Sequence, residues 1–153
     1  MTAIFQISGK AVAFTSAGTK KDILIQLANR FALAYGLDPD RVLEHLEERE
    51  KLGSTGFGRG VAIPHARMAD VRRPVAAMLK LEEPVDFLSS DGMPVDLVFG
   101  LLSPENAGAT HLHALAAISR LVREEGMHEA MSKAPDAEAL YALVSNVSAR
   151  DAA

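Results

Sequence analysis

The sequence predicts a single α/β domain in which helices cover both faces of one sheet. Helical patterns come before, between and after apolar runs of strand length, an order typical of a layered sheet. The chain has 153 residues, of which 48% are hydrophobic and 24% charged. A soluble chain of this size buries roughly two thirds of its unfolded surface in one core. Ligand sites in such folds gather at strand ends.

Two helices are predicted ahead of the first strand of this sheet. Residues 19–36 begin with a Thr-x-x-Asp start that resembles a capping box and continue with apolar residues at helical spacing. A second helix is predicted over residues 38–53, where Asp38 precedes Pro39 as a cap precedes the first helical position. This helix brings Arg49 next to the loop that follows it.

Three apolar segments are predicted to be strands, at residues 59–65, 75–81 and 95–102. In the first of them Val and Ile favour extended backbone, and Pro64 keeps Ile63 out of the α region. We therefore expect His65 to emerge at the end of this strand.

Helices are predicted again in the last third of the chain. The strongest pattern covers residues 110–125, a weaker one covers 127–133, and Asp136 is placed to cap a last helix before the polar tail 148–153. No internal repeat or low-complexity segment interrupts this order.

Composition excludes several classes of function. The chain has no cysteine, which rules out disulfides, thiolate zinc sites and thiol catalysis. A net charge of −4 and only 5% aromatic residues disfavour binding to nucleic acid. The longest apolar runs are too short to cross a bilayer and no secretory signal is recognised, so we expect a cytoplasmic protein with no direct membrane insertion.

The glycine-rich segment GSTGFGRGVAIPHAR, residues 53–67, is the most informative part of the chain. Its four closely spaced glycines leave room for a large anion or a partner surface. Ser54 and Thr55 add hydroxyl groups, and Arg49 adds positive charge nearby. Such a segment beside the imidazole of His65 suits the binding of a phosphoryl group.

Other interpretations of this loop have less support. It lacks the Gly-Lys-Ser/Thr of a P-loop, and Val61 stands where the third glycine of a GxGxxG fingerprint belongs. A Ser54 nucleophile working with His65 is conceivable, although Gly-Ser-Thr-Gly is not the GxSxG elbow of the serine hydrolases. A serine hydrolase therefore stays open as an alternative.

A second histidine cluster, His111 and His113, lies at the start of the helix predicted after residue 110. Residues two apart on a helix diverge by about 200°, and no HExxH pattern is present, so we expect no metal site. The helix start gives His111 backbone N–H groups as neighbours, which favours a phosphoryl anion. His113 is assigned a structural or surface role, whereas His45 and His128 are expected to be solvated.

The runs REKLGSTGFGRGVAIPHAR and PVDLVFGLLSPENAGATHLHAL resemble the enzyme IIA domain of the bacterial phosphotransferase system, in its fructose/mannitol family. The nitrogen-regulatory type is the most similar, and the resemblance spans residues 19–144. It implies one domain over residues 1–153, with a mixed sheet of about five strands between helices, and no cofactor or metal.

The resemblance also implies roles for individual residues. His65 is the implied acceptor of a phosphoryl group from a phosphorylated, nitrogen-type histidine-containing carrier protein. His111 and Arg49 match the second histidine and the arginine of the family's active site. We expect Arg49, loop amides and a protonated His111 to stabilise the phosphoryl group. The loop residues implied to line this site are Ser54, Thr55 and Gly56.

One residue departs from the family pattern, because Ala66 stands where members commonly carry glycine after the active histidine. If that position needs a positive φ, Ala66 is strained.

The implied function is regulatory: the phosphorylation state of His65 controls partner proteins such as potassium transport regulators or sensor kinases. Two alternatives stay open. One is a sugar-transport enzyme IIA that passes its phosphate to a separate IIB domain. The other is a metal-dependent or serine hydrolase.

Overall fold

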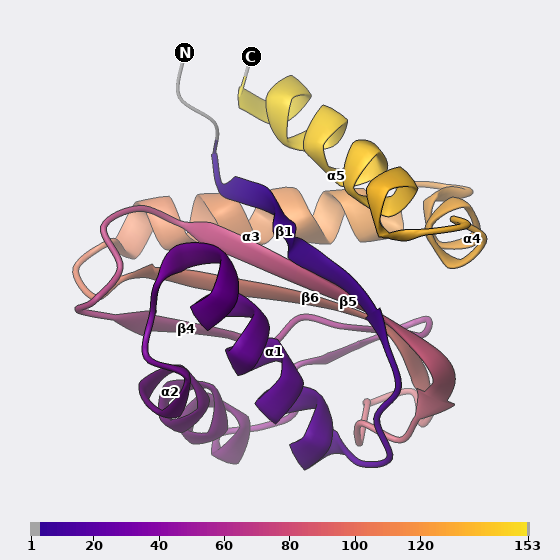
Figure 1. The fold of residues 1–153 in the computed structure, drawn as a ribbon, viewed down its shortest axis with the longest axis horizontal. Helices are drawn as coiled ribbons and strands as arrows, with labels where there is room; N and C mark the ends of the chain where they lie inside the picture. The colour runs from indigo at the N-terminus through magenta and orange to yellow at the C-terminus, as the bar shows by residue number, and fades with distance from the viewer. Residues whose placement is uncertain (1–3, 153) are drawn as a thin grey trace.

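The computed structural model contains one mixed sheet with helices packed against both of its faces (Figure 1). It describes the backbone of residues 4–152 and the side chains of residues 4–145. The predicted fold class is therefore confirmed, although the sheet has six strands and not about five. The strands are β1 (Gln6–Thr15), β2 (Gly56–Gly58), β3 (Val61–Ala62), β4 (His65–Met68), β5 (Val75–Val85) and β6 (Val95–Pro104). The helices are α1 (Lys20–Tyr35), α2 (Pro39–Lys51), α3 (Gly108–Arg123), α4 (Met127–Ser132) and α5 (Ala137–Ala152).

Strand β6 lies inside the sheet and carries most of its pairings. The strand order is β1-β5-β6-β3-β2, and β4 also pairs with β6. β5 runs antiparallel to β6, whereas β3 and β4 run parallel to it, and β1 is parallel to β5. The β4 register places His65 beside Leu101 and Arg67 beside Ser103. The sequence around the glycine-rich segment is thus joined directly to the centre of the sheet.

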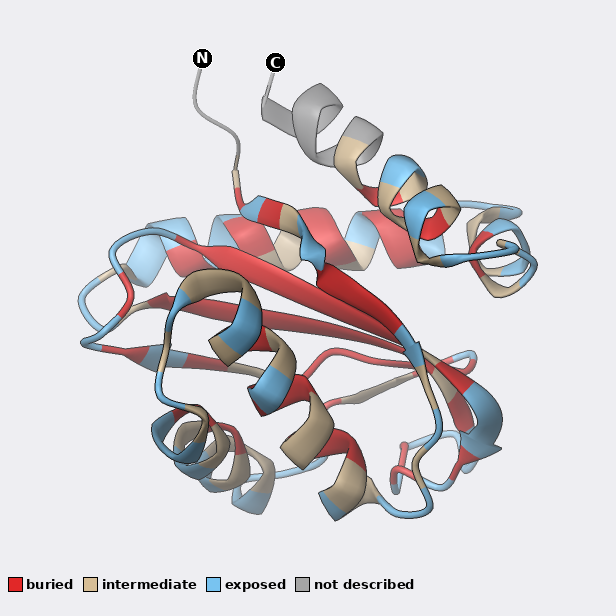
Figure 2. Cartoon of the chain, in the orientation of Figure 1, coloured by how far each residue is buried: buried red, intermediate tan, exposed pale blue. Residues whose placement is uncertain are grey.

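Buried residues lie along the strands and on parts of the helices packed against them (Figure 2), and their apolar side chains form one core cluster. Helix α1 packs on β1 and β5 and α2 packs on β4, while α3 covers β6 from the other side and α5 lies along β1. Gly100 in β6 permits a close approach of α1, since a Cβ there would lie 2.8 Å from Leu27 Cδ2 and 2.9 Å from Phe31 Cε2. None of the described helices is long and apolar enough to span a bilayer.

The predicted starts of the first two helices are confirmed. Thr19 Oγ1 accepts a hydrogen bond of 3.1 Å from the amide of Asp22, and α1 ends at Gly36 with φ 70°. Asp38 caps α2 by accepting from the amide of Asp40, with Pro39 as the first helical residue. Local capping signals therefore locate both helices.

The strand predictions were less accurate. The expected single strand over residues 59–65 is two short strands, β3 and β4, because Pro64 has no N–H with which to continue the ladder. His65 consequently opens β4 and does not end a strand. Strands β1 and β2 were not predicted, and α5 continues to Ala152, through most of the expected polar tail.

Candidate functional site

His65 stands half-buried at the first position of β4, with one ring nitrogen committed to the backbone. Its Nδ1 lies 2.7 Å from the carbonyl oxygen of Ile63. Because a carbonyl oxygen only accepts hydrogen bonds, Nδ1 carries the proton and Nε2 carries the lone pair. Burial, and to a smaller degree the charge of Arg49, lowers the pKa of His65 below its ordinary value. The ring is therefore a neutral imidazole with a free nucleophilic nitrogen near pH 7.

His111 is the second imidazole of this site, although it belongs to α3. Its ring centroid lies 5.7 Å from that of His65, with the ring planes tilted by 43°. Burial lowers the pKa of His111 to about 4, with smaller contributions from the charge that His65 carries when protonated and from Arg67. His111 is thus a neutral ring near pH 7 in this structure, whereas the protonated form was expected around a bound phosphoryl group. The residue His111 is only 7% exposed.

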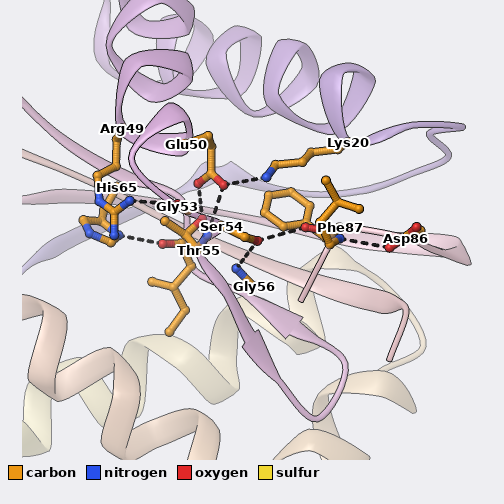
Figure 3. A network of polar contacts seen from close by, with 12 residues as sticks. Lys20, Arg49, Glu50, Gly53, Ser54, Thr55, Gly56, His65, Asp86 and Phe87 are labelled. Carbon is orange, nitrogen blue, oxygen red and sulfur yellow. Dashed lines mark hydrogen bonds and ion pairs between the residues drawn. The ribbon is translucent and has the colours of Figure 1, made fainter. Parts of the chain in front are cut away.

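Arg49 is in the last turn of α2 and points toward His65 (Figure 3). Its Nη1 donates a 2.9 Å hydrogen bond to the carbonyl of Gly53, at the start of the glycine-rich loop. A guanidinium has five N–H donors in a planar fork, so this bond leaves others for an anion. The structure therefore brings together the predicted arginine and the first predicted histidine.

Glu50 fixes the loop from inside the protein, a role that the sequence did not reveal. Its carboxylate accepts hydrogen bonds from the Thr55 amide, at 3.0 Å, and from the Thr55 hydroxyl, and it forms a 2.9 Å ion pair with Lys20. The Glu50 side chain is only 6% exposed. This Lys20–Glu50–Thr55 network, drawn in Figure 3, ties the loop to both α1 and α2.

The rest of the loop folds against the segment between β5 and β6. Ser54 Oγ donates to the carbonyl of Phe87 at 2.9 Å and accepts from the amide of Gly56 at 3.0 Å. A Cβ at Gly56 would lie 2.8 Å from Ser89 Cα, so this position has no room for a side chain. The Ser54 hydroxyl donates its hydrogen to the Phe87 carbonyl and not to a histidine that could act as a base, so the structure does not support Ser54 as a nucleophile.

Arg49, His65 and the glycine-rich loop line a hollow of about 220 Å³. The hollow includes the predicted Arg49 and the loop, and α3 completes it with two residues that were not predicted, Leu115 and Ser119. Leu115 and Ser119 lie four and eight residues after His111, a spacing that puts them on the same helix face, so the sequence alone could have indicated them. The lining residues are Arg49, Ser54, Thr55, Gly56, Phe57, Ile63, His65, Leu115 and Ser119.

Ala66 adopts an ordinary strand conformation, and the predicted strain is absent. It lies within β4, pairs with Leu102 of β6 and is buried. Among the described residues, only Arg59 and Leu88 combine a side chain with a positive φ. Alanine is therefore compatible with the backbone after His65.

The remaining histidines lie away from the hollow. His113 is exposed while His111 is buried, as expected for helix positions two apart. The sequence predicted a solvated His128, but the structure gives it a protein partner, since its Nε2 lies 2.9 Å from Asp96 Oδ1. Within residues 4–145 no group of three or more His, Cys, Asp or Glu side chains could hold a metal ion.

Comparison with known proteins gives one consistent answer. The family model for the "Phosphoenolpyruvate-dependent sugar phosphotransferase system, EIIA 2" matches residues 7–147. A "Nitrogen regulatory protein" of Pseudomonas aeruginosa is 44% identical over 140 residues, which are 91% of each chain. The crystal structure of Nitrogen Regulatory Protein IIA-Ntr from Neisseria meningitidis has a TM-score of 0.84 at 35% identity, covering 90% of this chain and 95% of that one.

A more distant structure shares the fold alone. The Escherichia coli enzyme IIAMTL, solved in complex with phosphorylated enzyme IIBMTL, has a TM-score of 0.75 at 17% identity and covers 92% of this chain and 99% of that one. Together with the family match over residues 7–147, these likenesses show that the chain belongs to the EIIA 2 family of the phosphoenolpyruvate-dependent sugar phosphotransferase system.

Proposed function

We propose that His65 accepts a phosphoryl group on Nε2 from a phosphorylated histidine-containing carrier protein, and that its phosphorylation state regulates partner proteins. The observation that carries this proposal is the 2.7 Å hydrogen bond from Nδ1 to the Ile63 carbonyl. It fixes the tautomer in which Nε2 is the nucleophile. The lowered pKa of His65 keeps that nitrogen unprotonated at neutral pH.

In the transfer step Nε2 attacks phosphorus in line with the N–P bond of the carrier. A new Nε2–P bond forms as the old bond breaks, and its electron pair stays on the carrier's imidazole. His65 keeps its Nδ1 proton throughout, since the Ile63 carbonyl holds it. The reverse of this step passes the group to a later acceptor and regenerates His65.

Positive charge and N–H donors around the hollow stabilise the transferred group. Arg49 lines the hollow and has further donors beyond the one bound to Gly53. A phosphoimidazole brings about two negative charges close to His111, which raises the pKa of that ring above the value of the unphosphorylated site. The protonated His111 then becomes a charged donor to the phosphoryl oxygens.

The regulatory type of function is supported by a relative named for nitrogen regulation, which matches 91% of this chain at 44% identity. This similarity favours a nitrogen-type carrier as the phosphoryl donor. It also favours regulated targets such as potassium transport regulators or sensor kinases, acting in the cytoplasm. Enzyme IIAMTL binds a IIB protein, so transfer to a IIB protein remains the alternative for the onward step.

Phosphorylation by a purified, ³²P-labelled carrier protein tests the proposal directly. We expect an acid-labile, alkali-stable label on the wild-type protein, no label on His65→Ala, and normal labelling of the control His113→Ala. ³¹P NMR of the product should show phosphate on Nε2. Full labelling of His65→Ala would refute the assignment, and phosphate on Nδ1 would refute the tautomer argument.

Regulation is tested by comparing what the two phosphorylation states bind. Phosphorylated wild-type protein and His65→Ala serve as baits in parallel pull-downs. A protein captured by only one state, and then shown to bind that purified state, identifies the output. Identical binding of every purified partner to both states contradicts regulation by phosphorylation.

A further inference from the structure

The geometry points to Ser103 as a positioning residue for this transfer: its hydroxyl donates a hydrogen bond to Nδ1 of His111 and so keeps the ring proton on Nε2. The inference rests on the function proposed for His65. Ser103 lies near the end of β6 and His111 in the first turns of α3. Their Oγ and Nδ1 atoms are 2.7 Å apart.

The direction of this hydrogen bond follows from the burial of Ser103. The residue is 0% exposed, and among the side chains described its hydroxyl bonds to His111 alone. If Nδ1 of the neutral ring were the donor, the hydroxyl hydrogen would point into the core without an acceptor; that arrangement arises only when His111 is protonated beside a bound phosphoryl group, whose negative charge offsets the cost. If the hydroxyl donates, both groups are satisfied, as buried polar groups almost always are.

The neutral imidazole of His111 carries a single N–H proton, either on Nδ1 or on Nε2. Because His111 is neutral in the unphosphorylated protein, a proton excluded from Nδ1 must be on Nε2. The ring centroids of His65 and His111 are 5.7 Å apart, so an N–H on Nε2 would put a hydrogen-bond donor, in place of a lone pair, on the imidazole that neighbours His65. An N–H attracts the oxygens of an arriving phosphoryl group, whereas a lone pair repels them. Ser103 thus selects the tautomer of His111 that assists transfer.

The sheet fixes the place of both imidazoles. His65 pairs with Leu101, and Arg67 pairs with Ser103, on the adjacent parallel strands β4 and β6. Residues two apart on a strand share a face, so His65 and the serine that holds His111 lie on the same side of the sheet. The spacing of the two rings therefore depends on a strand ladder, which is more rigid than a loop.

Histidine side-chain ¹⁵N NMR of the unphosphorylated protein measures the tautomer. We expect His111 to be in the Nε2–H form in the wild type and a mixture of tautomers in Ser103→Ala. Phosphoryl transfer to Ser103→Ala should be about tenfold slower, with His65 still the modified residue. Ser103→Thr keeps the hydroxyl and should restore both readings. Ser132→Ala, which removes a hydroxyl bound to Asp96, is the control.

The outcomes separate this inference from the proposed function. A wild-type His111 in the Nδ1–H form overturns the role of Ser103, and so does a Ser103→Ala protein with wild-type tautomer and rate. If Ser103→Ala does not fold, the wild-type spectrum alone decides. A wild-type protein that is never phosphorylated on His65 would contradict the proposed function while leaving the tautomer measurement valid.

Discussion

Replacing Glu50 by glutamine should loosen the loop beside His65 and lower the stability of the whole domain. The carboxylate accepts from the amide and the hydroxyl of Thr55 and pairs with Lys20 at 2.9 Å. Glutamine retains one oxygen for the amide, but its NH₂ group can no longer accept from the hydroxyl. The charge that faces Lys20 is also lost. Two of the three interactions are therefore removed.

The magnitude follows from how deeply the pair is buried. Removing one partner of a fully buried ion pair costs about 3–5 kcal/mol. The Lys20 side chain is 21% exposed and recovers part of its hydration, so we expect a loss of about 2–3 kcal/mol. For a domain of this size the loss corresponds to a Tm decrease of about 4–12 °C. Phosphoryl transfer should also slow, because Thr55 lines the hollow.

Urea unfolding and calorimetry at pH 7 provide the measurement, and the chain offers a matched control. Glu129 also pairs with a lysine, Lys133, at 2.6 Å, but the two side chains are 67% and 74% exposed. Glu129→Gln should change the unfolding free energy by less than about 0.5 kcal/mol. If Glu50→Gln costs no more than this control, the idea that the buried network anchors the loop is wrong.

Three further predictions concern pH and packing. The pKa of His111 is lowered from 6.5 to about 4 by folding, so the unfolded state binds more protons between these pH values and the folded protein loses stability as pH falls through them. In urea unfolding at pH 7 and pH 5, His111→Asn should reduce this loss of stability. An equal loss in the variant would exclude His111 as its source. Tyr35→Phe removes a hydroxyl that donates to the Ala76 carbonyl at 2.6 Å, and should cost about 1–2 kcal/mol in denaturant unfolding; no loss would contradict this anchor. Gly100→Ala should cost about 1–3 kcal/mol by overpacking against Leu27, and an unchanged Tm would show that α1 shifts freely.

The half of the site that lies in one continuous segment could be predicted from the sequence. Arg49, the glycine-rich loop and His65 lie close together along the chain, and a helix with clear capping signals precedes them. Local rules of capping and glycine conformation were enough to place them at one site. His111 lies far along the chain, and only the resemblance joined it to His65.

Other parts depend on tertiary contacts that the local sequence does not encode. Glu50 lies in the strongly charged run EEREK, where a carboxylate would ordinarily face water, and it is buried only because the loop folds over it. Ser103 ends an apolar run as any small polar residue might at a strand end. Strand β1 contains Gly9 and Lys10 and a register shift, so its pattern lacks a clean period of two.

The structure holds the two halves of the site by different means, and this difference bears on how a phosphoryl group is received. The imidazoles of His65 and His111 are positioned through β4 and β6, so their distance does not depend on the loop. Arg49 is held by a single hydrogen bond to the Gly53 carbonyl, whereas buried Glu50 anchors the loop at Thr55. In the proposed function, Arg49 would exchange its hydrogen bond to Gly53 for the incoming phosphoryl group while the imidazoles of His65 and His111 stay aligned. A rigid acceptor with one adaptable cation would suit the proposed role, in which the site both receives the group and releases it.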